Sequence, residues 1–156
     1  MRAYNAPPQQ FIIALSKELR STIGMPDWAF FVKTGEGRER PPQQEDWYFV
    51  RAAAILRTVA INGPIGTQKL RTKFGSRKNK GYKPEHFSKA GGSIIRDILQ
   101  QLDKAGLTKQ ELKSIHKGRF LTPKGQSLLD RVAKQFNPPA VKSAKKSDTK
   151  AEQKAE

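Results

Sequence analysis

Apolar residues recur at helical spacing in four long segments of the chain, residues 7–24, 46–62, 91–106 and 123–136. An apolar side chain at every third or fourth position predicts a helix that buries one face. Start and stop signals agree with these bounds, because prolines open the first and last segments and glycines close the first three. A shorter helix is expected at 66–75. The pattern therefore predicts a mainly helical domain.

The segment 46–62 is apolar on nearly every side, which is typical of a helix at the centre of a domain. Asp46 suits the positive end of its dipole. Arg51 and Arg57 interrupt the apolar surface, and six residues of helix separate their directions by about 240°. Because a buried, unpaired guanidinium is very costly, each arginine must reach a carboxylate, a phosphate or solvent. The sequence leaves these alternatives open.

Four segments lack helical spacing. Residues 27–35 fit a short helix or a buried strand, and their aromatic side chains are expected in the core. Residues 34–44 and 74–87 are rich in charged and turn-forming residues, so both are expected to be loops. Residues 112–122 read as two short strands turned at Lys117-Gly118.

The order helix, short helix, loop, helix, β-hairpin, helix is that of a winged-helix domain. We predict a mainly α, winged-helix-like fold built round the central helix (about 46–62) with a small β-hairpin wing (about 112–122). Residues 1–136 form one domain. Residues 137–156 are expected to be a disordered, Lys-rich tail, because Val141 is their one large apolar side chain.

The chain of 156 residues carries a formal charge of +16, of which residues 137–156 supply +2 and the predicted domain +14. Residues 63–90 hold +7, half of the domain's charge. Their cationic residues are Lys69, Arg71, Lys73, Arg77, Lys78, Lys80, Lys83 and Lys89, against Glu85 as the one acid. A charge so dense and so poorly balanced predicts a polyanionic partner whose phosphates these side chains bind.

The loop at 74–87 adds features that suit a nucleic acid. Its glycines permit close approach to a phosphate, and Gly91-Gly92 precede a helix N-terminus, which also favours anions. Tyr82 and His86 could stack on unpaired bases, whereas Phe87 is expected in the core. The wing contributes a second basic strip: Lys113, His116, Lys117 and Arg119.

Other function classes find little support in the sequence. His86 and His116 are the two histidines and lie far apart, the serines lack an identifiable base, and no phosphate-binding glycine motif occurs. We therefore expect no enzyme, no cofactor and no metal site. The absence of cysteine excludes disulfides and thiolate zinc sites and suits the cytoplasm. No apolar run reaches the roughly 20 residues that span a bilayer, so a membrane partner is not expected.

Three motifs in order resemble a known family: DWYFVRAAAILR at 46–57, FGSRKNKGYKPEHFSKAGGSIIR at 74–96 and GRFLTPKGQSLLDRVA at 118–133. They are similar to the small-subunit ribosomal protein S-nineteen-e (S19e) family of archaea and eukaryotes, and the chain most resembles an archaeal member. The resemblance covers roughly residues 5–136. It implies a winged-helix-like fold, a cytoplasmic location in the head of the small ribosomal subunit, and binding to ribosomal RNA beside neighbouring ribosomal proteins. It also implies a role in small-subunit assembly or maturation.

Carried over residue by residue, the resemblance implies RNA contacts at Arg51 and Arg57 and at the basic loop with its histidine. The loop residues are Arg77, Lys78, Lys80, Lys83 and His86. We therefore expect a structural RNA-binding constituent of the small ribosomal subunit that is monomeric when free.

The alternative is a winged-helix DNA-binding transcription regulator. Its recognition helix would expose Asp97 and Asp103, which face phosphates badly, and no dimer seam is evident. An adaptor for protein partners is a third class, but the exposed face of the first helix is too polar to favour it.

Overall fold

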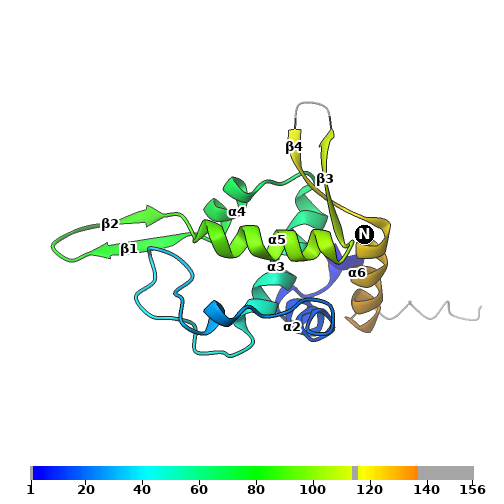
Figure 1. The fold of residues 1–156 in the computed structure, drawn as a ribbon, viewed down its shortest axis with the longest axis horizontal. Coiled ribbons are helices and arrows are strands. Elements are labelled where there is room, and N and C mark those ends of the chain that lie inside the picture. Colours follow the sequence, from blue (N-terminus) through cyan, green and yellow to red (C-terminus); the bar gives the residue numbers. More distant parts are fainter. Residues whose placement is uncertain (1, 114–115, 137–156) are drawn as a thin grey trace, which may run out of the picture.

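The computed structural model describes residues 2–113 and 116–136, which form a mainly helical winged-helix domain with two projecting β-hairpins (Figure 1). The predicted tail, 137–156, lies outside the described residues. The elements are α1 (Arg2–Asn5), α2 (Pro8–Leu19), the 3₁₀ helix η1 (Asp27–Phe30), α3 (Trp47–Asn62), α4 (Thr67–Lys73), β1 (Ser76–Lys80), β2 (Lys83–Ser88), α5 (Gly92–Lys104), β3 (Thr108–Lys113), β4 (His116–Leu121) and α6 (Pro123–Phe136).

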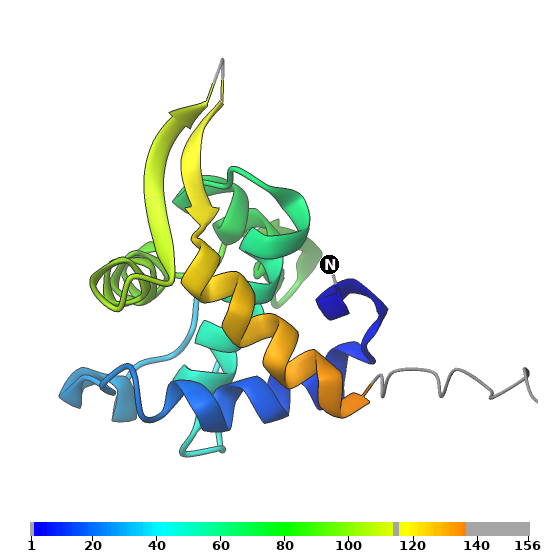
Figure 2. The ribbon, with the colours of Figure 1, turned by 90° about the vertical axis from the view of Figure 1, so that its right-hand side faces the viewer.

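Helix α3 is the central helix, as its all-round apolar sequence predicts. Ten of its residues are buried, among them Tyr48, whose ring meets those of Trp28, Trp47 and Phe49 edge to face with centroids 5.8–6.1 Å apart. Helix α2 packs against α3, and α6 crosses α2, an arrangement visible in Figure 2. Gly63, at φ 68°, ends α3 in a backbone conformation that favours glycine.

Helix α2 ends earlier than its apolar spacing predicts, at Leu19 instead of near Gly24. The carbonyl of Leu19 accepts hydrogen bonds from the backbone amides of both Thr22 and Ile23, which closes a tight turn. This turn directs Ile23 into the core, where it is 5% exposed. Ile23 therefore keeps its predicted burial without belonging to the helix.

The wing is larger than predicted, because β3 begins at Thr108 and pairs with β4 as far as Leu121. The predicted turn at Lys117-Gly118 is wrong, since Gly118 lies inside β4 opposite Glu111. A side chain at Gly118 would lie 2.7 Å from the backbone nitrogen of Ile65. This glycine therefore serves close packing of β4 on the segment between α3 and α4. Thr122 caps α6, because its hydroxyl accepts a hydrogen bond from the Gly125 amide.

The basic segment 74–87 is a β-hairpin, not the predicted loop. Strands β1 and β2 pair antiparallel and project from one end of the molecule (Figure 1). Gly81, at φ 69°, forms the turn, and the Asn79 side chain accepts a hydrogen bond from the Gly81 amide at 2.7 Å. Neither strand has a buried face, so the alternation that reveals a strand in a sequence is missing.

The aromatic stretch after Pro26 forms η1, the first of the two predicted alternatives. Its short turn directs Ala29 into the core, where it is 1% exposed, and leaves Trp28 half-buried. Phe30 and Phe31 remain 60% and 85% exposed. The expectation that all these aromatic side chains are in the core is therefore wrong for these two.

Candidate nucleic-acid interface

The hairpin β1–β2 presents four of its basic side chains on one face, whereas Arg77, next to Lys78 on β1, lies on the other. Residues directly opposite each other in a β-ladder share a face, and the register pairs Lys78 with His86 and Lys80 with Lys83. Lys78 and Lys80 are two positions apart on β1, so all four side chains lie on the same side. The irregularity in the register falls on β2 around Pro84, where the missing amide of proline is tolerated.

Two ion pairs link this hairpin to acids. Lys78 Nζ lies 2.6 Å from a carboxylate oxygen of Glu36, and Arg77 Nε lies 3.6 Å from one of Glu85. The Lys78 ammonium lowers the pKa of Glu36, by hydrogen bonding first and by charge second. The remaining six cationic residues of the 63–90 cluster form no ion pair among the described residues: Lys69, Arg71, Lys73, Lys80, Lys83 and Lys89.

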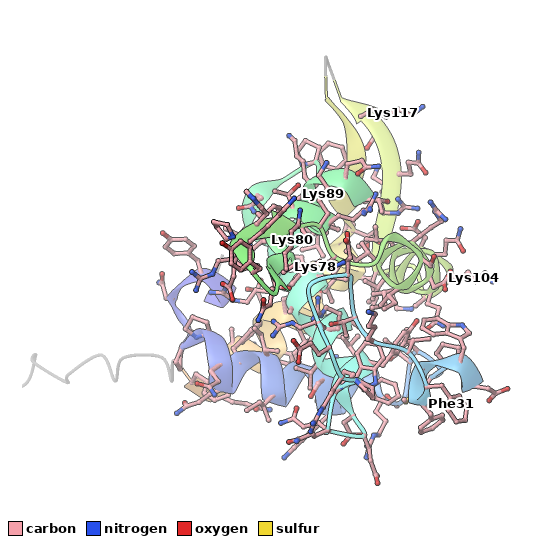
Figure 3. The ribbon with its side chains drawn as sticks, turned by 90° about the vertical axis from the view of Figure 1, so that its left-hand side faces the viewer. Phe31, Lys78, Lys80, Lys89, Lys104 and Lys117 are labelled. Atoms are coloured by element: carbon pink, nitrogen blue, oxygen red, sulfur yellow. The ribbon has the colours of Figure 1, made fainter. Side chains whose placement is uncertain are left out.

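These cationic residues are gathered at one end of the molecule. Figure 3 views this end and shows Lys78, Lys80 and Lys89 toward the viewer, with Lys117 out on the wing. Lys69 and Lys73 are exposed on α4, which packs against α5 close to the base of the hairpin. The dense charge predicted from the sequence is therefore concentrated in space as well as along the chain.

Arg71 has a structural role within the cluster. Its Nε donates a hydrogen bond to the carbonyl of Ala90 at 3.1 Å, and its side chain lies where a Cβ at Gly92 would contact it. Arg71 thereby joins α4 to the start of α5. At that start, the Gly91 amide already donates to the Thr34 carbonyl, so the predicted anion site at this helix end has one amide fewer to offer.

The two arginines of α3 leave on different sides, as their spacing predicts. The Arg51 guanidinium lies over the ring of Phe74, 4.7 Å from its centroid, and burial together with the nearby charge of Arg38 lowers the pKa of Arg51. Arg57 is half-buried, and its Nε has no hydrogen-bond partner among the described residues. Neither forms an ion pair in the described ranges 2–113 and 116–136, so neither anchors the core in that way.

Arg119, in contrast, is matched to an acid. Its Nε lies 2.7 Å from Asp103 Oδ2, and Thr108 donates its hydroxyl to Asp103 Oδ1 at 2.6 Å. This arrangement corrects the expectation that Asp103 is exposed on the recognition helix, because the carboxylate is turned to the wing. Lys117, farther out on β4, is exposed and forms no ion pair among the described residues.

The aromatic residues of the hairpin differ from the sequence expectation in one case. Tyr82 is fully exposed beside Gly81 at the turn. Phe87, which the sequence predicts in the core, is 54% exposed, and its ring lies against the backbone of Gly75. Both rings are therefore accessible to a base.

Sequence reasoning also missed the charge of the 34–44 loop. In the sequence, Glu36 and Glu39 lie beside Arg38 and Arg40 and balance their charge, but in the structure Glu36 pairs with Lys78 of the hairpin. In the part of the chain that the structure describes, Arg38 and Arg40 form no ion pair. A contact between residues so far apart in sequence leaves no local signal.

Two further features of the described residues concern metal ligands and membrane spans. No group of three or more metal-ligating side chains occurs among them. Of their helices, none is long and apolar enough to cross a membrane.

Comparison with known proteins decides the family. The family model for ribosomal protein S19e matches residues 2–138, which includes the central helix, the cationic hairpin and the wing. The chain belongs to the ribosomal protein S19e family. The similarity predicted from three motifs is thus confirmed over nearly the whole winged-helix domain.

Relatives within the S19e family come from archaea and eukaryotes. The small ribosomal subunit protein eS19 of Aeropyrum pernix is 43% identical over 92% of this chain and 94% of its own length. The protein of the same name from Haloarcula marismortui is 43% identical over 83% and 87%. That of the clam Mya arenaria is 44% identical over 78% and 80%. These S19e relatives match this chain over most of their own length.

Proposed function

We propose that this protein is a structural, non-catalytic constituent of the small ribosomal subunit that binds ribosomal RNA in the head region. Relatives that match most of this chain's length are named small ribosomal subunit proteins. In this proposal the protein works on cytoplasmic ribosomes, contacts neighbouring ribosomal proteins, contributes to subunit assembly and is monomeric when free.

The observation that supports RNA binding is the cluster of unpaired cations at the hairpin end of the molecule. Phosphate contacts come from Lys69, Lys73, Lys80, Lys83 and Lys89, with Arg77, Lys78 and His86 on the hairpin, Lys117 on the wing, and Arg51 and Arg57 on α3. Arg71 supports this surface by joining α4 to the start of α5. Arg119 has a structural role, because the charge of Arg119 is already balanced by Asp103 and the pair ties the wing to α5.

The alternative of a DNA-reading transcription regulator is weaker on the same geometry. Such a protein places its recognition helix in the major groove and reads base edges there. Here the unpaired charge lies on the hairpin before α5, whereas Asp97 lies on α5 itself. A projecting cationic hairpin suits irregular, folded RNA, which is recognised largely by shape and backbone.

The test is incorporation into the small subunit. Tagged protein expressed in cells of its source organism should follow the small-subunit peak on a sucrose gradient at moderate salt. The triple variant Arg77→Ala, Lys78→Ala and Lys80→Ala should melt like the wild type but leave that peak. On small-subunit RNA, the salt dependence of its binding should be shallower by about 2 logarithmic units per decade of salt.

A matched control removes the same charge elsewhere. Lys17, Arg131 and Lys134 are exposed on α2 and α6, and their replacement by alanine should leave incorporation unchanged. Equal loss in both triple variants would mean that net charge alone matters. Recovery of the wild type only on duplex DNA would favour the regulator.

A further inference from the structure

A groove outside the hairpin has the chemistry of a binding site. It encloses about 430 Å³ between α3, the 34–44 loop and Phe74, and Arg38, Arg40 and Arg51 all line it. Its lining is also apolar in part, with Pro41 and Pro42 of the loop and Phe74. A groove with three guanidinium groups beside apolar side chains suits a ligand that is both anionic and flat.

The cations of this groove are not engaged by the protein itself. Among the described residues, none of the three arginines forms an ion pair. The Arg51 guanidinium lies over the ring of Phe74, 4.7 Å from its centroid, and lines the groove. Crowding of like charges costs free energy in the free protein, and an anion would relieve this cost.

The groove adjoins the cationic hairpin. Gly37 of the loop packs so closely on β1 that a side chain there would clash with Ser76, and Glu36 of the same loop pairs with Lys78. Phe74 stands just before β1. A strand whose phosphates lie along the hairpin would therefore pass the mouth of the groove.

We propose that this arginine groove takes one unstacked nucleotide of the bound RNA. Its phosphate would meet Arg51, Arg38 and Arg40, and its base would lie against the prolines and Phe74. A volume of about 430 Å³ suits a single nucleotide but not a base-paired helix. The inference rests on the proposed RNA-binding function and adds that one site selects unpaired RNA, because stacked bases in a helix cannot enter.

The test compares two fluorescein-labelled RNA hairpins that differ in one bulged nucleotide, measured by fluorescence anisotropy at fixed salt. The wild type should bind the bulged hairpin about tenfold more tightly, the order that stacking of one base supplies. Arg38→Gln should bring the two affinities together and leave binding of the paired hairpin nearly unchanged. Arg51→Gln also removes one of the proposed phosphate contacts, so it should weaken binding of both hairpins but lower the affinity for the bulged one more. With 2-aminopurine at the bulge, binding of the wild type should change the fluorescence of the 2-aminopurine, whereas addition of either variant should not.

Controls separate this proposal from the general one. Arg131→Gln, the same change on exposed α6, should keep the preference for the bulge. Arg38 lies on an exposed loop, so its variant reports even if Arg51→Gln fails to fold. Equal binding of both hairpins by the wild type, or a preference that survives both variants, would overturn the proposed nucleotide site in the groove and leave the proposed RNA-binding function standing. Binding of neither RNA would also overturn the proposed function. Oligoglutamate that binds as tightly as bulged RNA and is lost in Arg51→Gln would assign the groove to an acidic protein segment instead.

Discussion

The ion pair between Asp103 and Arg119 is expected to hold the wing to α5, and Asp103→Asn tests this. Both carboxylate oxygens are used, one by Arg119 Nε at 2.7 Å and the other by the Thr108 hydroxyl at 2.6 Å. Asparagine can still accept the bond from Thr108, but it removes the negative charge beside Arg119. The guanidinium then remains largely buried without a counter-charge.

The size of the effect follows from the exposure of the two side chains. Removal of one partner from a fully buried pair costs about 3–5 kcal/mol, whereas exposed pairs contribute about 0–1 kcal/mol. Here 14% of the Arg119 side chain and 27% of the Asp103 side chain remain exposed. We therefore expect Asp103→Asn to lower the free energy of unfolding by about 2 kcal/mol. For a domain of this size that corresponds to a fall in Tm of about 6 °C.

The assay is urea unfolding followed by circular dichroism, on Asp103→Asn, Arg119→Met and the double variant. Because the two side chains act on each other, the double variant should lose less stability than the two single variants together. A loss below about 0.5 kcal/mol for Asp103→Asn, or simple additivity, would refute the reasoning. If Arg119→Met weakened RNA binding at unchanged stability, Arg119 would be an RNA contact, as the sequence alone predicts.

Three further predictions concern packing, pH and charge. Gly125→Ala should destabilise the protein by about 2 kcal/mol in the same urea assay, because the new methyl group would clash with the carbonyl of Leu107. Burial raises the pKa of Tyr48 to about 12, so the unfolded chain releases this proton first as pH rises above 10. The free energy of unfolding should then fall by up to about 1.4 kcal/mol per pH unit. An unchanged free energy of unfolding across pH 10–11.5 would contradict this prediction. Lys80→Thr removes repulsion with Lys83, so it should raise Tm slightly, measured by calorimetry, and weaken RNA binding, measured by anisotropy. A rise in both Tm and RNA affinity would argue against RNA as the partner.

The long helices could be predicted because each buries apolar residues that its own spacing reveals, whereas the four-residue helix α1 was not predicted. The stripe of α5, for example, consists of Ile94, Ile95, Ile98, Leu99 and Leu102, and all five are buried as expected. Helix α2 shows the limit of this reasoning. Ile23 continues the apolar spacing, but a turn closed at Leu19 brings it into the core by another route.

The hairpins were harder because their signals are not in their apolar pattern. Strands β1 and β2 bury no face, and the one local signal was Gly81 at the first place of a two-residue turn. At Gly118 a turn signal misled, because the glycine is needed for contact with Ile65, a residue more than fifty positions away. Most of the candidate site residues were predicted from charge, and Arg51 and Arg57 from the family resemblance. The pairing of such residues with Glu36 or Asp103 depends on the fold.

The free protein carries a cost at its cationic hairpin, and this cost supports a polyanion as the partner. An isolated two-stranded hairpin is marginally stable, and this one buries no side chain and sets Lys80 directly opposite Lys83. One tie to the body is the exposed pair between Lys78 and Glu36, which is weak at physiological salt. A hairpin selected for stability alone would carry opposite charges or apolar residues at these positions. A phosphate chain along Lys78, Lys80 and Lys83 would attract their ammonium groups and offset the repulsion among them. Binding of RNA and ordering of the hairpin should therefore occur together.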